Sequence, residues 1–276
     1  MTHVGKVMRA LLIIWIALLF FLPVWWVAVS ALRPQEDIFR FLSPLSAWTL
    51  WPNNATLAFV IELRHGPFAR AILNSIYVTS VTVAIGLVLS AFSGFALAVM
   101  RFKFRNAIFI IVVVSFLIPF DAIALPLFGI LSRAGLQNTY SGLILPGIGN
   151  GLAVFLFRQF FLGIPKEIRE AALIDGMGWF GIFRRIYLPL SRPAIISAGL
   201  ILFVFQWQAY LWPLIIAPAP EYKVAAIAIA QFSDIFGVNY SLIFAAAFFI
   251  SLIPMIVLVV FQRYFTASVA ASASKG

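Results

Sequence analysis

The chain has no cysteine, and its 276 residues include only two histidines, His3 and His65. The missing thiols exclude a disulfide framework, a cysteine nucleophile and a cysteine-ligated metal site. The two histidines stand far apart in the sequence and suggest no metal centre. No Gly-x-x-x-x-Gly-Lys-Ser/Thr phosphate loop occurs either. We therefore expect no cofactor on this chain, and no ATP binding or hydrolysis by the chain itself.

Charged residues are scarce as well, at 10% of the chain against 63% hydrophobic residues. A soluble domain carries about 25% charged residues and far fewer apolar ones. So little polar surface cannot cover so many apolar side chains in water, and lipid must provide much of the surroundings. The composition therefore predicts a membrane protein.

Six apolar stretches reach the length of about 20 residues that a helix needs to cross a bilayer. They cover residues 10–32, 71–100, 106–131, 139–162, 193–217 and 241–265. We therefore predict an all-α fold, in which residues 1–276 form one domain built as a bundle of six transmembrane helices. Prolines 119, 126 and 213 are expected to kink the third and fifth stretches or to mark their ends. The first stretch is longer than the apolar part of a signal peptide, so it is expected to remain as an uncleaved span.

The basic residues are divided unevenly between the two sides of this predicted bundle. If the loops alternate, thirteen of the 19 lysines and arginines fall on the side that holds both termini, and six fall on the other. Basic loops stay in the cytoplasm, so both termini are expected there. The acids on that side are Glu167, Glu170 and Asp175, so it carries the whole net charge of +10. The charge is thus a topology signal, and it gives no support to nucleic-acid binding.

Two segments between the predicted spans are long: residues 33–70 outside and residues 163–192 in the cytoplasm. The inner segment is predicted to begin with a short helix, because Pro165 suits a first helical position and Gly176 can adopt the left-handed conformation that closes a helix. Lys166 and Glu170 can pair at i, i+4 on that helix.

A second helix is predicted in the same segment, lying at the membrane surface. Its apolar residues recur at i, i+4 and i+7, and they are Trp179, Phe183 and Ile186. Pro189 is expected to end it.

Residue by residue, the inner segment resembles the signature of the permeases of binding-protein-dependent ABC importers. That signature reads Glu-Ala-Ala, three residues, Gly, nine residues, Ile, one residue, Leu-Pro. The matching positions are Glu170, Ala171, Ala172, Gly176, Ile186, Leu188 and Pro189. Further positions are similar to the carbohydrate branch of that family, the maltose-type permeases: Ile164-Pro165, Asp175, Pro193, Asn74-Ser75, Leu145-Pro146 and Tyr210-Leu211-Trp212-Pro213.

The resemblance implies a permease subunit that translocates a sugar or sugar-like solute and performs no bond chemistry. Its implied partners are a second related permease, two ATPase subunits that hold ATP and Mg, and an extracytoplasmic binding protein, either periplasmic or lipid-anchored. The helix around Glu170 would dock in a groove of the ATPase as a coupling loop. The implied location is the bacterial cytoplasmic (inner) membrane, where the chain is a multi-pass protein surrounded by lipid.

Polar and aromatic residues interrupt the fifth stretch: Gln206, Trp207, Gln208 and Tyr210. Aromatic rings stack on the apolar faces of sugars and amides bind their hydroxyl groups, so these residues are candidates for the substrate pathway. Alternatively, the amides bond neighbouring helices and the aromatic residues form an interfacial belt. Residues 206, 208 and 210 cannot share one helix face, so either the helix is broken here or only some of them line a path.

Two other functions stay open at this point. An ion-coupled secondary transporter of a small polar solute usually has internal repeats and buried acids at mid-membrane. Asp121 is the single acid at apparent membrane depth, and it is kept as a candidate pathway residue although the outer interface could hydrate it. A membrane-embedded enzyme is a third class, but the sequence suggests no nucleophile with a base and no metal cluster.

Overall fold

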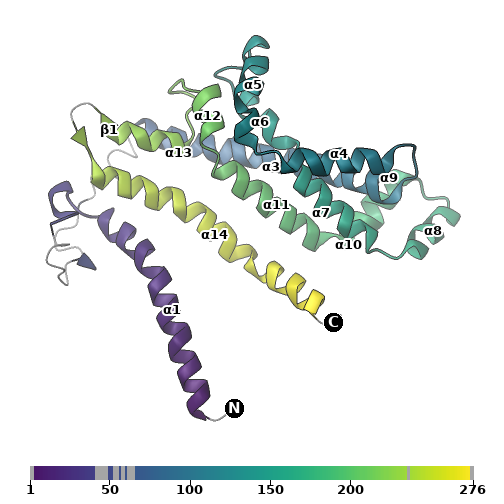
Figure 1. Ribbon diagram of the computed structural model, residues 1–276, viewed down its shortest axis with the longest axis horizontal. Helices are drawn as coiled ribbons and strands as arrows, with labels where there is room; N and C mark the ends of the chain where they lie inside the picture. The colour runs from purple at the N-terminus through teal and green to yellow at the C-terminus, as the bar shows by residue number, and fades with distance from the viewer. Residues whose placement is uncertain are drawn as a thin grey trace. The chain divides into compact units, whose positions relative to one another are not determined.

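The computed structural model describes residues 3–40, 49–51, 56, 60, 66–234 and 237–273. Most of the predicted outer segment, together with His65, lies outside the described residues. Helices dominate the part that is described (Figure 1), which confirms the prediction of an all-α fold. The strands among these residues are one antiparallel pair, β1 (Ser233–Asp234) and β2 (Gly237–Val238).

The chain forms two compact units. The first consists of Met1–Ile72 and Ile227–Ile253, and the second of Leu73–Ala226 and Pro254–Gly276. The first unit holds these elements: α1 (His3–Ser30), η1 (Gln35–Asp37), the first residues of α3 (Pro67–Val99), the end of α13 (Ala225–Ala228), η4 (Ile229–Phe232), the strand pair and the first part of α14 (Tyr240–Ala273). Its core is small and is made of Ala31, Phe68, Ala71, Ala228, Phe232, Ala245 and Ala246.

A buried arginine organises the chain just after α1. Arg33 is fully buried, and its guanidinium donates to the carbonyl oxygen of Trp51 over 3.2 Å. The hydroxyl of Ser241 donates to the backbone oxygen of Arg33 over 2.6 Å, which ties the residues after α1 to the start of α14. Burial lowers the pKa of Arg33, and the negative charge of Asp37 partly offsets that effect.

The second unit holds the rest of α3 and the segment that contains both candidate sites. Its further elements are α4 (Arg105–Leu117), α5 (Phe120–Arg133), α6 (Tyr140–Ile148), α7 (Gly151–Leu162), α8 (Lys166–Ile174), α9 (Trp179–Ile182), η3 (Phe183–Tyr187), α10 (Leu188–Leu190), α11 (Arg192–Trp207) and α12 (Leu211–Ile216). Helix α7 packs against α11 and α4, and α12 packs against α5 and α6 (Figure 1).

Close contact between α3 and α7 depends on a glycine. A Cβ atom at Gly94 would lie 2.6 Å from the Cβ of Phe157 and 3.0 Å from the amide nitrogen of Arg158. The two helix backbones can therefore approach each other only because Gly94 has no side chain. This contact lies in the main core cluster of the unit, which includes Phe95, Phe157 and Phe161.

Four helices are long and apolar enough to cross a membrane: Gly5–Ser30, Pro67–Val99, Tyr140–Leu162 and Tyr240–Gln262. Two bent pairs also pass the test when each pair is taken together. Helices α4 and α5 meet at 100°, and Trp179–Leu190 meets α11 at 81°. The described residues thus hold four such helices, or up to six if each bent pair is one span, and the predicted six-span bundle fits this range.

Pro119 interrupts the third stretch as expected, whereas Pro126 lies inside α5, and in the fifth stretch the break does not fall at the proline. Pro119 stands at the N-cap of α5, and Ile118 before it is extended, as steric contact with a proline ring favours. In the fifth stretch α11 ends at Trp207 and α12 begins at Leu211. The break therefore precedes Pro213, which lies inside α12.

Candidate functional site

The first helix of the inner segment, α8, runs from Lys166 to Ile174. Pro165 is its N-cap, with φ −54° and ψ 131°, so the proline precedes the helix and is not its first residue. Glu167 lies in the first turn, where its negative charge is favourable to the helix dipole. Sequence reasoning thus located this helix to within one residue at its beginning.

Gly176 closes α8 in the way that the sequence predicted. Its φ is +78°, in the left-handed region. The amide of Met177 donates to the carbonyl of Ala172 over 2.9 Å, and the amide of Gly176 donates to Leu173 over 3.1 Å. These are the two hydrogen bonds of a Schellman motif, and they satisfy carbonyl groups at the helix end.

The residues of the Glu-Ala-Ala signature divide into an inward and an outward set. Ala172 is buried in the main core cluster, and Ile186 and Leu188 are half-buried against that cluster. The outward set is exposed and consists of Glu170, Ala171, Asp175, Gly176 and Pro189. One small residue therefore anchors α8 to the protein, while the opposite face of the helix is left open.

Glu170 forms an ion pair with Arg169, its neighbour, over 3.2 Å, rather than the expected pair with Lys166. The Glu170 side chain is about half exposed, at 55%, so the pair contributes little to stability. Arg169 is less exposed and acts electrostatically on Tyr187 as well. Burial raises the pKa of the Tyr187 phenol, and the positive charge of Arg169 partly offsets this rise.

The second helix of the segment is continuous from Trp179 to Leu190, but its middle part, η3, is a π-helix. Of the predicted stripe, Phe183 is buried and Ile186 packs against the core cluster, but Trp179 is 40% exposed. Ile182 and Tyr187, which were not predicted, are fully buried. The wider π turn shifts later residues around the axis, which a regular period of 3.6 residues cannot anticipate.

The sequence predicted that Pro189 would end this helix, but the structure shows that it does not. It lies inside α10, and the helix continues to Leu190. The preceding π turn can relieve the clash that a proline ring makes with the carbonyl four residues before it. The chain then bends by 81° at Ser191, whose hydroxyl donates to the carbonyl of Tyr187 over 2.7 Å.

Aromatic rings connect this second helix to the long helices behind it. The Phe95 ring of α3 lies 5.2 Å from the ring of Phe183 and 5.1 Å from that of Tyr187, both edge to face. Tyr187 also meets Phe161 of α7, with ring centroids 5.5 Å apart. Such pairs add packing energy beyond the area they bury. A displacement of the second helix would therefore be transmitted to α3 and α7.

The candidate pathway residues surround the break between α11 and α12. Trp207 is buried and stacks on Phe203 at 5.7 Å, whereas Gln208 and Tyr210 are exposed. The side-chain oxygen of Gln206 lies so close to Gly147 that a Cβ atom there would clash with it. The four residues are thus not brought to one face, and the amide of Gln206 fills the contact between α11 and α6.

Asp121 is exposed in the first turn of α5. Its neighbour Phe120 meets Trp212 edge to face at 5.8 Å. The indole of Trp212 donates to the carbonyl of Gly142 over 3.0 Å, which fixes α12 on α6. No group of three or more His, Cys, Asp and Glu side chains among the described residues could hold a metal ion.

Comparison with known proteins identifies the family. The model of the binding-protein-dependent transport system inner membrane component matches residues 86–271. The chain belongs to this family. It is therefore a multi-pass membrane permease component and not the catalytic subunit of its transport system, as the resemblance implied.

Relatives of this permease include transporters from several bacteria. The arabinooligosaccharides transport system permease protein AraQ of Halalkalibacterium halodurans is 38% identical over 204 residues, which are 74% of this chain and 73% of AraQ. The sn-glycerol-3-phosphate transport system permease protein UgpE of Agrobacterium fabrum is 32% identical over 267 residues, 95% of each chain. A crystal structure of a bacterial ABC transporter involved in the import of the acidic polysaccharide alginate has the same fold, with a TM-score of 0.81 at 20% identity, covering 95% of this permease and 96% of that chain.

Sequence reasoning missed the most exposed apolar side chain of α8. Ile174 is 87% exposed although it is large and apolar. Successive residues of a helix are about 100° apart, so Ile174 lies on the face opposite Ala172. This spacing is the signal that could have revealed it, because burial of Ala172 forces Ile174 outward. Ile168 of the same helix is exposed as well, at 41%.

In the sequence Asn74 is only part of the family pattern, but in the structure it holds the first part of α3 to a distant loop. Its amide donates to the carbonyl oxygens of Glu221 and Lys223, each over 2.9 Å. The hydroxyl of Tyr140 donates to its side-chain oxygen over 2.8 Å. Asn74, Tyr140 and the loop at residues 221–223 are far apart in the sequence, so no local pattern could have revealed this role.

Proposed function

We propose that this permease translocates a sugar or sugar-like solute in an ATP-driven importer. The names of its relatives support this substrate class: AraQ for arabinooligosaccharides, UgpE for sn-glycerol-3-phosphate, and LacG of Rhizobium radiobacter for lactose. All three solutes carry free hydroxyl groups, which amide and aromatic side chains can bind.

The single observation that carries the coupling role is the outward face of α8. Glu170, Ala171 and Ile174 are exposed together on a helix that Ala172 anchors from behind. Ala171 leaves the helix backbone accessible to a partner, and Ile174 offers an apolar side chain for burial. We propose that residues 163–192 are the coupling loop and that this face enters a groove of the partner ATPase.

The transmission that we propose is mechanical. The second helix of the loop meets α11 at 81° and is packed on α3 and α7 through its aromatic rings. Closure of the ATPase subunits on ATP would move the docked helix, and these contacts would move the bundle as a rigid body between inward-facing and outward-facing states. Glu170 and its neighbours contact the partner and break no bond.

The assembly proposed for this permease contains a second related permease, two ATPase subunits with ATP and Mg, and an extracytoplasmic solute-binding protein. It lies in the bacterial inner membrane as one six-span domain with both termini in the cytoplasm. Gln208 and Tyr210, exposed at the break between α11 and α12, are proposed to line the pathway; Gln206, Trp207 and Asp121 stay candidates beside them.

A charge reversal tests the proposal. Glu170→Lys should leave the permease inserted but remove ATPase co-purification and ATP-dependent sugar uptake in proteoliposomes. Glu221→Lys, an exposed acid in the predicted outer loop, is the matched control and should behave as wild type. Normal uptake by Glu170→Lys would contradict the coupling role. Uptake driven by an ion gradient without ATP would contradict the importer itself.

A further inference from the structure

The turn between α3 and α4 combines positive charge, exposed aromatic rings and a cavity. The cavity has a volume of about 400 Å³ and opens at the surface. It is lined by Arg101, Phe102, Phe104, Arg105, Asn106 and Ala107. The turn lies outside α8 and outside the break between α11 and α12, so the proposed function gives these residues no role.

The positive charges of the turn are not neutralised by neighbouring acids. Arg101, Lys103 and Arg105 occur within five residues, and residues 100–107 contain no Asp or Glu. Among the described residues, none of the three forms an ion pair. Arg158 of α7 also lies close enough to Arg105 for their charges to repel. The local field therefore favours an anion.

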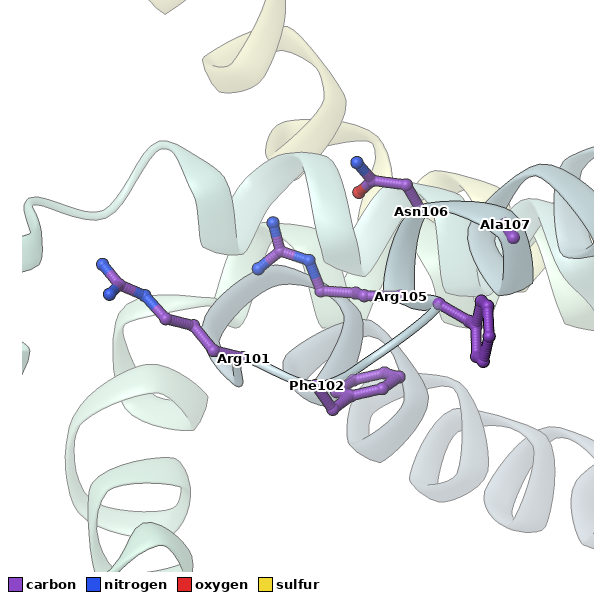
Figure 2. A pocket seen from close by; sticks show the side chains of 6 residues that line it. Arg101, Phe102, Arg105, Asn106 and Ala107 are labelled. Atoms are coloured by element: carbon purple, nitrogen blue, oxygen red, sulfur yellow. The ribbon is translucent and has the colours of Figure 1, made fainter.

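The two arginines that line the cavity are placed to bind an anion together. Figure 2 shows the side chains of Arg101 and Arg105 extending in the same direction, away from the ring of Phe102. Arg105 donates one N–H to the carbonyl of Met100 over 3.1 Å. A guanidinium has five N–H donors in a planar fork, so both arginines keep donors for a phosphate or carboxylate.

The aromatic residues of the turn are exposed where a soluble protein would bury them. Phe104 is 67% exposed and Phe102 is 43% exposed. Phe104 also has φ +65°, a left-handed conformation that a phenylalanine rarely adopts. The ammonium of Lys103 lies 5.0 Å from the centre of its ring. Exposed rings beside basic residues are typical of surfaces that lie at the headgroup level of a bilayer.

We propose that this turn binds the phosphate headgroup of an anionic phospholipid in the cytoplasmic leaflet. Arg101 and Arg105 donate hydrogen bonds to the phosphate, and the rings of Phe102 and Phe104 lie against the upper part of the acyl chains. A lipid is favoured over a soluble anion because the rings need an apolar partner next to the charge. The exposed Ile110 and Ile111 of α4, which follow in the sequence, continue this apolar surface.

The test counts lipids bound to the detergent-purified full chain by native mass spectrometry, with phosphatidylglycerol and phosphatidylcholine added in separate titrations. Wild type should prefer phosphatidylglycerol, and Arg101→Gln should weaken its binding about fivefold, the usual effect of one basic residue near an anionic surface. Arg133→Gln removes an exposed arginine from the end of α5 and is the matched control that should change nothing. Binding should also fall when the salt concentration rises.

Phe104→Gly tests the role of the aromatic ring without disturbing the backbone of the turn. Glycine adopts φ +65° without strain, so the turn should keep its shape while phosphatidylglycerol binding weakens. Equal binding of the two lipids, or an unchanged affinity in Arg101→Gln, would overturn the proposal. So would displacement of the lipid by an equal concentration of inorganic phosphate, which indicates a site for free anions. If Arg101→Gln or Phe104→Gly lost ATPase co-purification while lipid binding was unchanged, the turn would be assigned to a protein contact instead.

Discussion

Met177 and Ala172 are joined by a backbone hydrogen bond of 2.9 Å that crosses Gly176 and closes α8. Ala172 is at the same time the buried residue of that helix. Ala172 therefore both accepts the hydrogen bond that closes the helix and anchors the helix to the protein. Changes at Gly176 should alter the position of the whole exposed face of α8, although a Cβ atom at this position would meet no other atom within 4 Å.

Gly176→Ala should impair coupling through the backbone alone. A Cβ atom at this position meets no other atom within 4 Å, but φ is +78°, where a side chain costs about 1 kcal/mol. The helix end should fray, and ATP-dependent uptake should fall while insertion is unchanged. Gly178 offers the matched control, because it also has free space but an ordinary φ of −72°. If Gly176→Ala and Gly178→Ala transport equally well, the geometry of the cap is not needed.

Ile174→Ala should weaken partner binding without destabilising the permease. The side chain is 87% exposed, so the free permease loses almost no packing when it is removed. If a groove of the ATPase buries it, the complex loses about 1.5 kcal/mol or more, which is at least about tenfold in affinity. The measurement is ATPase binding to the permease in nanodiscs, together with thermal unfolding of the permease alone.

Ile182→Ala is the contrasting variant for that experiment. Ile182 is fully buried in the main core cluster. Its truncation should cost about 2–5 kcal/mol of stability, and partner binding should suffer only as a result. A stable Ile174→Ala permease with wild-type ATPase affinity would show that the exposed isoleucine is not part of the contact.

Sequence reasoning predicted the first helix of residues 163–192 well because its signals are local. A glycine next to a helix end predicts a left-handed residue, and Gly176 has one. The predicted apolar stripe is confirmed at Phe183 and Ile186 but not at Trp179, which is exposed. The burial of Tyr187 was not predicted, since the π-helix from Phe183 to Tyr187 changes the angular period. The bend of 100° at Pro119 was foreseen as a kink, but its size depends on tertiary contacts of α4 and α5.

The candidate pathway was harder to predict for the same physical reason. Gln206, Trp207, Gln208 and Tyr210 share a composition that suits a sugar, but the exposure of each is decided by its neighbours. Gly147 makes room for the amide of Gln206, and the two residues are far apart in sequence. What the sequence did anticipate is the interruption of the helix, which the structure places between Trp207 and Leu211.

The predicted topology can be tested cleanly because the chain has no cysteine of its own. Single cysteines at Lys103 and Lys166 should react with an impermeant thiol reagent from the cytoplasmic side. A cysteine at Gln137 should react from the opposite side, since it follows α5. All three positions are exposed. Labelling of Gln137→Cys and Lys166→Cys from one side would rule out the six-span arrangement.

Gln208→Ala should lower transport without lowering stability. Gln208 caps α11 through its backbone amide, which donates to Val204 over 3.1 Å, and alanine keeps that bond. Its side chain is exposed at the break and free to bind a hydroxyl group of the solute. Loss of one such hydrogen bond costs about 1–3 kcal/mol, or roughly a five- to hundredfold loss of affinity in the state that makes it.

Uptake and substrate-stimulated ATPase activity should therefore need a higher solute concentration in Gln208→Ala than in wild type. Gln159→Ala removes an exposed amide from α7, away from the break, and should leave both activities unchanged. Gln206→Ala is expected to differ from both, because it empties the contact with Gly147 and should lower thermal stability as well. Equal activity of Gln208→Ala and Gln159→Ala at every solute concentration would remove the break from the pathway, since an exposed amide that touches the solute cannot be lost without effect.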